Sequence, residues 1–316
     1  MADINEQYGL VTPMKVLEAV DSSIKYENVY SFRGDDILTR FFGIDYELDG
    51  GMEPGKLYLL GGVKQSAKTA FAINLANNIA LDGLGGVAYI SLVDSAHTII
   101  RRSAEISGGI DINRTQMRKE RVRGERMSEE RMSGERMSRE EYLDEISATM
   151  TNYEGRRFYA FNGMADGLFD ATDIAKLIDT IPKGLDLVII DDIDVMKNIY
   201  MSETRKTGID MLASGLKELA KRKHCAILCI CTVVENSIKS LKDYEEFENL
   251  WYLEAPTAKY LQNGPYKEAE LVISMKHSEE PAVVLLDYHE GQQKFSSAGE
   301  RKLIRRKSID IDTDFK

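Results

Sequence analysis

The feature that most constrains the fold is a glycine-containing loop between an apolar strand and a helix. Residues 56–60 (Lys-Leu-Tyr-Leu-Leu) have the composition of a buried strand, and a Glu-Pro-Gly turn at 53–55 precedes them. Residues 68–81 carry apolar side chains on a broad stripe, which predicts a helix. The connecting stretch, residues 61–69, reads Gly-Gly-Val-Lys-Gln-Ser-Ala-Lys-Thr. A strand that enters such a loop and continues into a helix predicts an α/β domain.

The loop agrees with the phosphate-binding pattern G-x-x-x-x-G-K-[ST] at all but one of its fixed positions. Gly62, Lys68 and Thr69 fit the pattern, and Ala67 stands where the second glycine belongs. Backbone N–H groups of such a loop point at phosphate oxygens, beside a helix N-terminus that favours anions. Alanine at this position costs on the order of 1 kcal/mol unless its φ stays negative. The predicted nucleotide-binding residues are Gly62, Val63, Lys64, Gln65, Ser66, Ala67, Lys68 and Thr69.

A magnesium ion bound with a nucleoside triphosphate takes ligands from two places in this kind of fold. The Thr69 hydroxyl is the first, next to the Lys68 ammonium that contacts the β- and γ-phosphates. The second is an acid at the end of another core strand, and the apolar run 185–190 ends at Asp191. The alternative is an aspartate that merely ends a strand. The sequence therefore predicts Lys68 as a catalytic residue and Thr69 and Asp191 as Mg²⁺ ligands.

The rest of the chain repeats the alternation of strand and helix. A second continuous apolar strand, Gly-Val-Ala-Tyr-Ile-Ser-Leu, is predicted at residues 86–92. Such strands separated by helices are typical of a mainly parallel sheet with helices on both faces. Further strands are predicted at 185–190, 226–231, 270–274 and 282–286, and helices at 172–181 and 209–223.

The composition narrows the class of protein. No run of about 18 apolar residues occurs, and the first residues lack the regions of a signal peptide, so we expect a cytoplasmic protein without membrane contact. The net charge of −11 argues against a protein that coats nucleic acid with its whole surface. Cys225, Cys229 and Cys231 share one strand face, but no fourth ligand follows at zinc-like spacing. We interpret these thiols as core residues rather than metal ligands.

A five-residue unit, close to Glu-Arg-Met-Ser-x, occurs four times in residues 120–139. A period of five matches neither a helix face nor a strand face, so no apolar stripe forms. We interpret these residues as a low-complexity repeat inserted in an exposed surface connection. A dedicated binding arm is the alternative.

Several stretches resemble the motor domain of DnaB-type replicative helicases. The resemblance implies a RecA-like P-loop NTPase fold at 36–296, which binds ATP and Mg²⁺, with an N-terminal arm or linker helix at 1–35 and a charged tail at 297–316. The resemblance does not extend to the family's separate N-terminal domain, which we expect to be absent. A single unit of the repeat resembles an element of the family's helical connection. The stretches that carry the resemblance are 43–57, 70–76, 89–92, 108–111, 136–142, 184–191 and 216–220.

The chain departs from this family at the positions that drive hydrolysis. Val93 stands where the family places its water-activating glutamate, with Asp94 next to it. Thr232 replaces the glutamine that senses the γ-phosphate, and His277 replaces the arginine finger, a group that contributes roughly 10³–10⁵ in rate. A shift of one residue in the alignment makes Asp94 or Lys276 the substitute, so Asp94 is the second candidate catalytic residue. The resemblance thus implies retained phosphate binding and reduced or lost hydrolysis.

Three functions are weighed on these residues. The first is an ATP-binding DnaB-like protein linked to DNA replication or repair. The second is an active ATP-dependent DNA helicase or translocase with rearranged catalytic residues. A small-molecule kinase is disfavoured because no lid-like arginine cluster is present. The expected partners are a nucleoside triphosphate, single-stranded DNA, and a homo-oligomer or a replicative helicase partner.

DNA contact is expected at the loops that follow the two central strands. The two loops after the central strands carry acids as well as bases, so their net field is not basic. The most basic cluster is 301–307, which we interpret as a solvated tail. The candidate basic residues of the loops are Lys197, Arg205, Lys206, Lys239 and Lys242.

Overall fold

The structure is a computed structural model that describes residues 35–81, 85–114, 137–163, 169–181, 184–235, 237–258, 266–276, 280–298 and 304–306. The predicted N-terminal arm or linker helix up to residue 34, the repeat up to residue 136 and most of the predicted tail lie outside the described residues. The domain limits at 36–296 stay a prediction.

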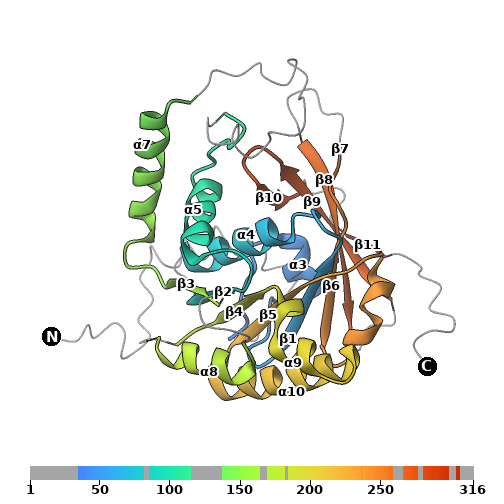
Figure 1. The fold of residues 1–316 in the computed structure, drawn as a ribbon. Helices are drawn as coiled ribbons and strands as arrows, with labels where there is room; N and C mark the ends of the chain where they lie inside the picture. Colours follow the sequence, from blue (N-terminus) through green and yellow to red (C-terminus); the bar gives the residue numbers. More distant parts are fainter. Residues whose placement is uncertain are drawn as a thin grey trace, which may run out of the picture.

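The described strands belong to one sheet at the centre of the domain (Figure 1). They are β1 (Leu57–Gly62), β2 (Val87–Ser91), β3 (Phe158–Asn162), β4 (Leu187–Asp191), β5 (Ala226–Thr232), β6 (Asn249–Leu253), β7 (Thr257–Ala258), β8 (Tyr266–Met275), β9 (Ala282–His289), β10 (Lys294–Ser297) and β11 (Ile304–Arg306).

The strand order is β10-β9-β8-β6-β1-β5-β4-β2-β3, with β7 beside β8 and β11 beside β9. The pairs from β6 to β3 along this path are parallel, and those from β6 to β10 are antiparallel. The predicted mainly parallel sheet is thus confirmed. β8 is twice as long as the predicted strand at 270–274, and five strands were not predicted: β3, β6, β7, β10 and β11.

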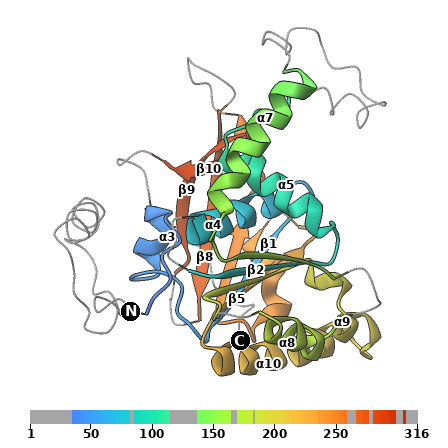
Figure 2. The ribbon, with the colours of Figure 1, turned by 90° about the vertical axis from the view of Figure 1, so that its left-hand side faces the viewer.

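Helices cover both faces of the sheet, as predicted (Figures 1 and 2). α4 and α5 lie on one face, and α8, α9 and α10 on the other. The bounds are α3 (Phe42–Glu47), α4 (Lys68–Leu81), α5 (Ala96–Ser107), α7 (Arg139–Met150), α8 (Ala171–Asp179), α9 (Lys197–Met201), α10 (Arg205–Lys223), and the 3-10 helices η2 (Thr151–Tyr153), η3 (Ile193–Val195) and η4 (Ile238–Tyr244).

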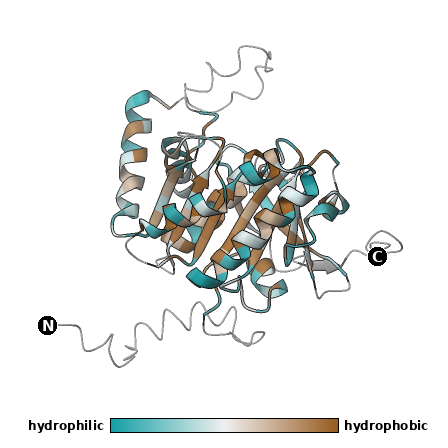
Figure 3. Ribbon diagram, turned by 60° about the horizontal axis from the view of Figure 1, so that its bottom comes forward, coloured by the Kyte–Doolittle hydropathy of each residue, from teal (hydrophilic) through white to brown (hydrophobic). Residues whose placement is uncertain are grey.

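Alternate residues of each central strand enter the two cores. In β2, Tyr89 packs toward α4 and α5, whereas Ile90 packs toward α8 and α10. The central strands are mostly hydrophobic, and the flanking helices contain both hydrophobic and hydrophilic residues (Figure 3). This layered packing holds the ends of β1, β2, β4 and β5 side by side at one edge of the sheet.

The last unit of the repeat begins α7. Ser138 caps the helix in a reciprocal box with Glu141, a residue that the earlier units do not have three positions after their serine. Met137 is buried beside Ile110 and Tyr142. The expectation of a solvated repeat is therefore wrong for Met137, because this side chain closes a small apolar cluster under α7.

Cys225, Cys229 and Cys231 are free, buried thiols on the α10 side of the sheet, as the core interpretation predicts. No cluster of three or more His, Cys, Asp or Glu side chains suited to a metal ion occurs among the described residues. Within the same residues, no helix has the length and apolarity needed to cross a bilayer.

Candidate nucleotide-binding site

The predicted phosphate loop joins the end of β1 to the start of α4. β1 lies between β5 and β6 near the middle of the sheet, so both strands fix the point at which the loop begins. Gly62 permits the turn: a Cβ there would lie 2.5 Å from Ser66 Oγ and 2.8 Å from the Leu253 carbonyl oxygen. The close approach of these neighbours explains why glycine occupies this position.

Lys68 reaches back across the loop that it ends. Its ammonium donates to the carbonyl oxygens of Gly62 and Val63, both at 2.9 Å. Burial lowers the pKa of Lys68, while the nearby carboxylates of Asp192 and Asp191 oppose that shift. The lysine therefore brings a positive charge into the centre of the loop.

Two loop residues have the left-handed backbone conformation. Gln65 has φ = 67° and Ala67 has φ = 66°. Ala67 therefore carries the cost of about 1 kcal/mol that the sequence allowed for, because its Cβ crowds the backbone where the motif has glycine. The loop keeps the shape that the motif requires despite the substitution.

Ser66 fits a phosphate ligand. Its side chain is buried, and its Oγ has no hydrogen-bond partner among the described residues. A buried hydroxyl without a partner costs roughly 1–3 kcal/mol, which a phosphate oxygen in the loop would offset. The orphaned hydroxyl and the Lys68 ammonium thus form a donor set suited to a phosphate group.

The two predicted metal ligands meet although 122 positions separate them. The Thr69 hydroxyl donates to Asp191 Oδ2 at 2.9 Å. The phenol of Tyr89, on β2, donates to the same oxygen at 2.7 Å. Burial raises the pKa of Asp191, and these two hydrogen bonds oppose the shift. A hydroxyl and a carboxylate held together at the start of α4 are the oxygen ligands that Mg²⁺ prefers.

Tyr89 was not identified from the sequence. It orients Asp191 as an outer partner of a metal ligand does. The sequence places Tyr89 in a continuous apolar strand, but the pairing of that strand with β4 and the position of Tyr89 on the α4 face come from the structure.

The end of β2 offers a weaker catalytic arrangement. Val93 is 56% exposed and has no polar group to direct at a water molecule. Asp94 pairs with Arg102, with 3.6 Å between Oδ2 and Nη1. Arg102 also donates to Gln293 Oε1 at 3.0 Å, which ties it to the β9–β10 turn. Asp94 is therefore held in an ion pair with α5.

At the same sheet edge, Thr232 and Arg205 make contacts with two aspartates that sequence reasoning did not predict. The Thr232 hydroxyl donates to Asp192 Oδ2 at 2.9 Å, and its backbone N–H donates to Asp194 Oδ2 at 2.8 Å. Arg205 pairs with Asp194 at 2.5 Å and donates to the Tyr244 hydroxyl at 2.8 Å. Burial beside Asp194 raises the pKa of Asp192. The carboxylates of Asp192 and Asp194 thus hold Thr232, which stands where the family has the glutamine that senses the γ-phosphate.

Two of the candidate basic residues are neutralised by neighbours. Arg205 binds Asp194, and Lys206 lies 3.5 Å from Asp210 on the same helix. Lys276 is exposed after β8, and His277 lies outside the described residues. The structure thus brings together Lys68, Thr69 and Asp191, and places Asp94 in an ion pair.

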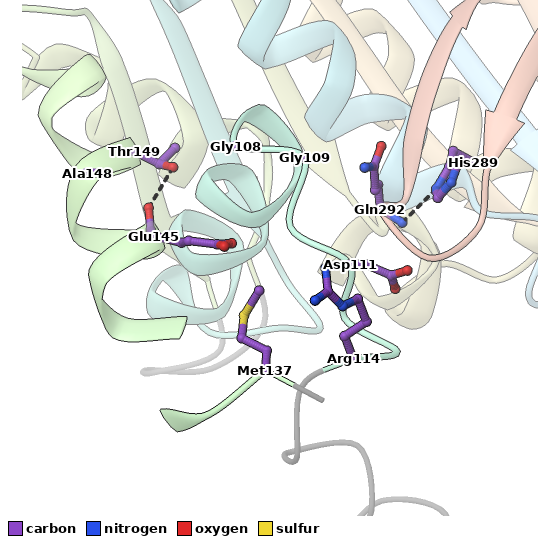
Figure 4. Close-up of a pocket in the computed structure, with 10 residues that line it drawn as sticks. All are labelled: Gly108, Gly109, Asp111, Arg114, Met137, Glu145, Ala148, Thr149, His289 and Gln292. Atoms are coloured by element: carbon purple, nitrogen blue, oxygen red, sulfur yellow. Dashed lines mark hydrogen bonds between the residues drawn. The ribbon is translucent and has the colours of Figure 1, made fainter. Parts of the chain in front are cut away.

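A separate cavity of about 500 Å³ lies between α5, α7 and the β9–β10 turn (Figure 4). Asp111 and Arg114 line it from the segment after α5, and Glu145 lines it from α7. His289 Nδ1 accepts from the Gln292 backbone N–H at 3.2 Å on the opposite wall. The cavity shares no residue with the phosphate loop, so it is not part of the candidate site.

The strand order and the loop at the end of β1 define a RecA-like P-loop domain. The sequence matches the family of the DnaB-like helicase C terminal domain over residues 36–240, which is more than half of the chain. The chain therefore belongs to that family. None of the curated proteins compared with it matches.

Solved structures agree on the fold. One of them, described as an ATPase domain, has 15% identity and a TM-score of 0.65, with 91% of this chain and 99% of that chain covered. A DnaB-like replicative helicase, described with its interactions with primase, has 15% identity and a TM-score of 0.64, with 91% of this chain and 67% of that chain covered. The RadB recombinase has 15% identity and a TM-score of 0.50, with 83% of this chain and 100% of that chain covered. At these identities the likeness shows the RecA-like fold alone.

Proposed function

We propose that this chain is an ATP-binding protein of the DnaB-like helicase family, linked to DNA replication or repair, with reduced or lost hydrolysis. The single observation that carries the proposal is the contrast at one sheet edge. Thr69 and Asp191 hold each other at 2.9 Å beside the phosphate loop, whereas Val93 stands exposed at the position of the family's glutamate.

Nucleotide binding follows from the donors in the loop. Lys68 and the Ser66 hydroxyl would contact phosphate oxygens, and the loop N–H groups lie at the N-terminus of α4. Thr69 and Asp191 would hold Mg²⁺, which neutralises charge on the β- and γ-phosphates when bound. Tyr89 would keep the Asp191 carboxylate turned toward the metal.

Weak hydrolysis follows from what the surrounding residues do. A water-activating group must lie within about 3 Å of its water, directly or through one more water. Valine at position 93 cannot accept a proton, and Asp94 is engaged by Arg102. Thr232 is bound to Asp192 and Asp194. Each of these features lowers the expected rate independently.

The second candidate is an active ATP-dependent DNA helicase or translocase with rearranged catalytic residues. The observation that favours it is the acidic group at the end of β4, where Asp192 lies near Lys68. Single-stranded DNA and a homo-oligomer or a replicative helicase partner are the proposed partners in both cases, with the cytoplasm as the proposed location.

An ATP titration combined with a turnover assay tests the proposal. ATP–Mg²⁺ is expected to bind the full chain, and phosphate release is expected to stay slow with and without added single-stranded DNA. Brisk, DNA-stimulated turnover favours the active motor. Absence of ATP binding removes both candidates.

A further inference from the structure

Asp192 is a half-buried acid that directly follows Asp191 at the end of β4. Its Oδ1 accepts from the Asp194 N–H and its Oδ2 accepts from the Thr232 hydroxyl, both at 2.9 Å. Because both oxygens accept a hydrogen bond, the side chain cannot rotate away without losing one of them. The negative charge of Asp192 therefore has a defined position at this edge of the sheet.

The contact with Thr232 holds Asp192 close to the phosphate loop. Thr232 on β5 is the register partner of Gly62 on β1, where the loop begins, and neighbouring strands lie about 4.8 Å apart. The Gly62 carbonyl oxygen accepts from the Val233 N–H at 3.2 Å and from the Lys68 ammonium at 2.9 Å. The carboxylate of Asp192 thus lies near the Lys68 ammonium, and its charge acts on that group.

The charge of Asp192 differs from those of the two nearby aspartates. Asp194 pairs with Arg205 at 2.5 Å, and Asp191 would hold Mg²⁺. Asp192 accepts from a hydroxyl and a backbone N–H, and among the described residues it has no ion pair of its own. Its negative charge is therefore not offset by a cationic side chain.

The γ-phosphate is the part of a nucleotide that would meet this charge. In P-loop proteins the loop N–H groups hold the α- and β-phosphates, whereas the lysine and Mg²⁺ contact the β- and γ-phosphates. Here Lys68 and the Thr69–Asp191 pair both lie on the side of the loop that faces Asp192. Like charges that are partly withdrawn from water repel each other strongly. A nucleoside diphosphate has no γ-phosphate and avoids this repulsion.

We propose that Asp192 sets the specificity of the phosphate site, so that a nucleoside diphosphate binds more tightly than the corresponding triphosphate. The inference rests on the proposed function, because it takes the loop as the nucleotide site. It deepens that function, since the triphosphate would then displace the diphosphate only when it is in large excess.

Titrations of ADP and of ATP, each with Mg²⁺, into the full-length chain and Asp192→Asn test the proposal. Asparagine keeps the size of the side chain and removes its charge, and the Thr232 hydroxyl can turn to accept from the new amide. The titrations are made at about pH 8.5, because burial and the neighbouring Asp194 raise the pKa of Asp192 to about 7. Asp210→Asn removes a carboxylate on α10, 3.5 Å from Lys206, and is the control for net charge.

The unmodified chain and Asp210→Asn are expected to bind ADP at least about tenfold more tightly than ATP. Asp192→Asn is expected to bind ATP at least about tenfold more tightly than the unmodified chain does, while its affinity for ADP changes less than about threefold. The retained ADP affinity shows that the loop is intact. Fluorescence of Trp251, the single and buried tryptophan, reports whether each variant is folded.

Other outcomes overturn the proposal. Equal affinities of the unmodified chain for ADP and ATP remove the specificity. An equal gain for both nucleotides in Asp192→Asn shows a general effect of charge, and a loss of ATP affinity shows that Asp192 assists the metal instead. In each of these cases nucleotide still binds and the proposed function stands, whereas a chain that binds neither nucleotide contradicts both. If Asp192→Asn is unfolded, Asp192→Ser and the affinities of the unmodified chain decide the result.

Discussion

The residues that would bind the phosphates of the nucleotide (the phosphate side) and those that would position the attacking water (the water side) come from different parts of the chain. The phosphate side consists of contiguous residues 61–69, completed by Asp191 from β4. The water side of the family needs residues from the ends of several strands and from a neighbouring subunit. Here Val93 at the end of β2 is exposed, and Thr232 at the end of β5 is bound by carboxylates. The phosphate side thus depends mainly on one contiguous loop, whereas the water side depends on residues from separate parts of the chain.

A substitution on the phosphate side and one on the water side also differ in energetic cost. The loop contributes several donors, so one unfavourable residue such as Ala67 costs only about 1 kcal/mol. Removal of an arginine finger alone costs roughly 10³–10⁵ in rate, which is about 4–7 kcal/mol of barrier. A site is therefore able to lose turnover while it retains nucleotide binding. The predictions that follow test this separation of the two sides.

The largest effect is expected for Lys68→Ala. We expect ATP–Mg²⁺ at a hundredfold excess over Kd to stabilise the unmodified chain by about 2.7 kcal/mol, and Lys68→Ala to abolish this stabilisation. The reason is the loss of the ammonium that lies within the loop. Thermal unfolding with and without ATP–Mg²⁺ measures the shift. Lys206→Ala, which removes an exposed lysine on α10, is the control and should keep the shift. Equal shifts in all three proteins contradict the assignment of the loop.

Asp191→Asn is expected to have the next largest effect. The substitution removes the carboxylate charge that would hold Mg²⁺, so the gain in ATP affinity on adding Mg²⁺ should fall by at least the roughly 10–100-fold that is typical for loss of an outer partner of a metal ligand. Titrations of ATP in Mg²⁺ and in a chelator measure that gain. Tyr89→Phe removes only the 2.7 Å hydrogen bond to Asp191 and should cause a smaller loss. A larger loss in Tyr89→Phe than in Asp191→Asn counts against Asp191 as a metal ligand.

Features formed by neighbouring residues in the sequence were predicted, whereas contacts between residues from different strands were not. The P-loop is contiguous, and Asp191 ends a long apolar strand, so pattern and spacing find both. Tyr89 and the Thr232–Asp192 contact depend on which strands become neighbours, and no local pattern encodes that. β3 was missed because it is short, half-buried and preceded by two arginines. The sequence left the sign of φ at Ala67 open, and the structure shows the positive value that alanine rarely adopts.

Val93→Glu is expected to raise turnover modestly, by less than about tenfold. Position 93 is 56% exposed, so a glutamate fits there without burial of its charge. It would restore a group able to orient water, but Thr232 and the residues after β8 would still lack the family's sensor and finger. Phosphate release under ATP saturation measures the change, and Val93→Gln is the matched control without the carboxylate. A gain of a thousandfold would show that the other catalytic groups are intact.

The smallest effect is expected for Asp94→Asn. Asp94 is half-exposed and 3.6 Å from Arg102, and such surface pairs contribute less than about 1 kcal/mol to stability. Its side chain is one methylene shorter than the family's glutamate and one residue further along, so it is poorly placed to orient a water for in-line attack. We therefore expect turnover to change less than about twofold.

Asp210→Asn, which breaks the 3.5 Å pair with Lys206, is the control for loss of a surface ion pair. DNA-stimulated hydrolysis that is brisk in the unmodified chain, lost in Asp94→Asn and kept in Asp210→Asn would make Asp94 the water-activating residue. In that case the two sides of the site would both be intact, and the active motor would be the better description of this chain.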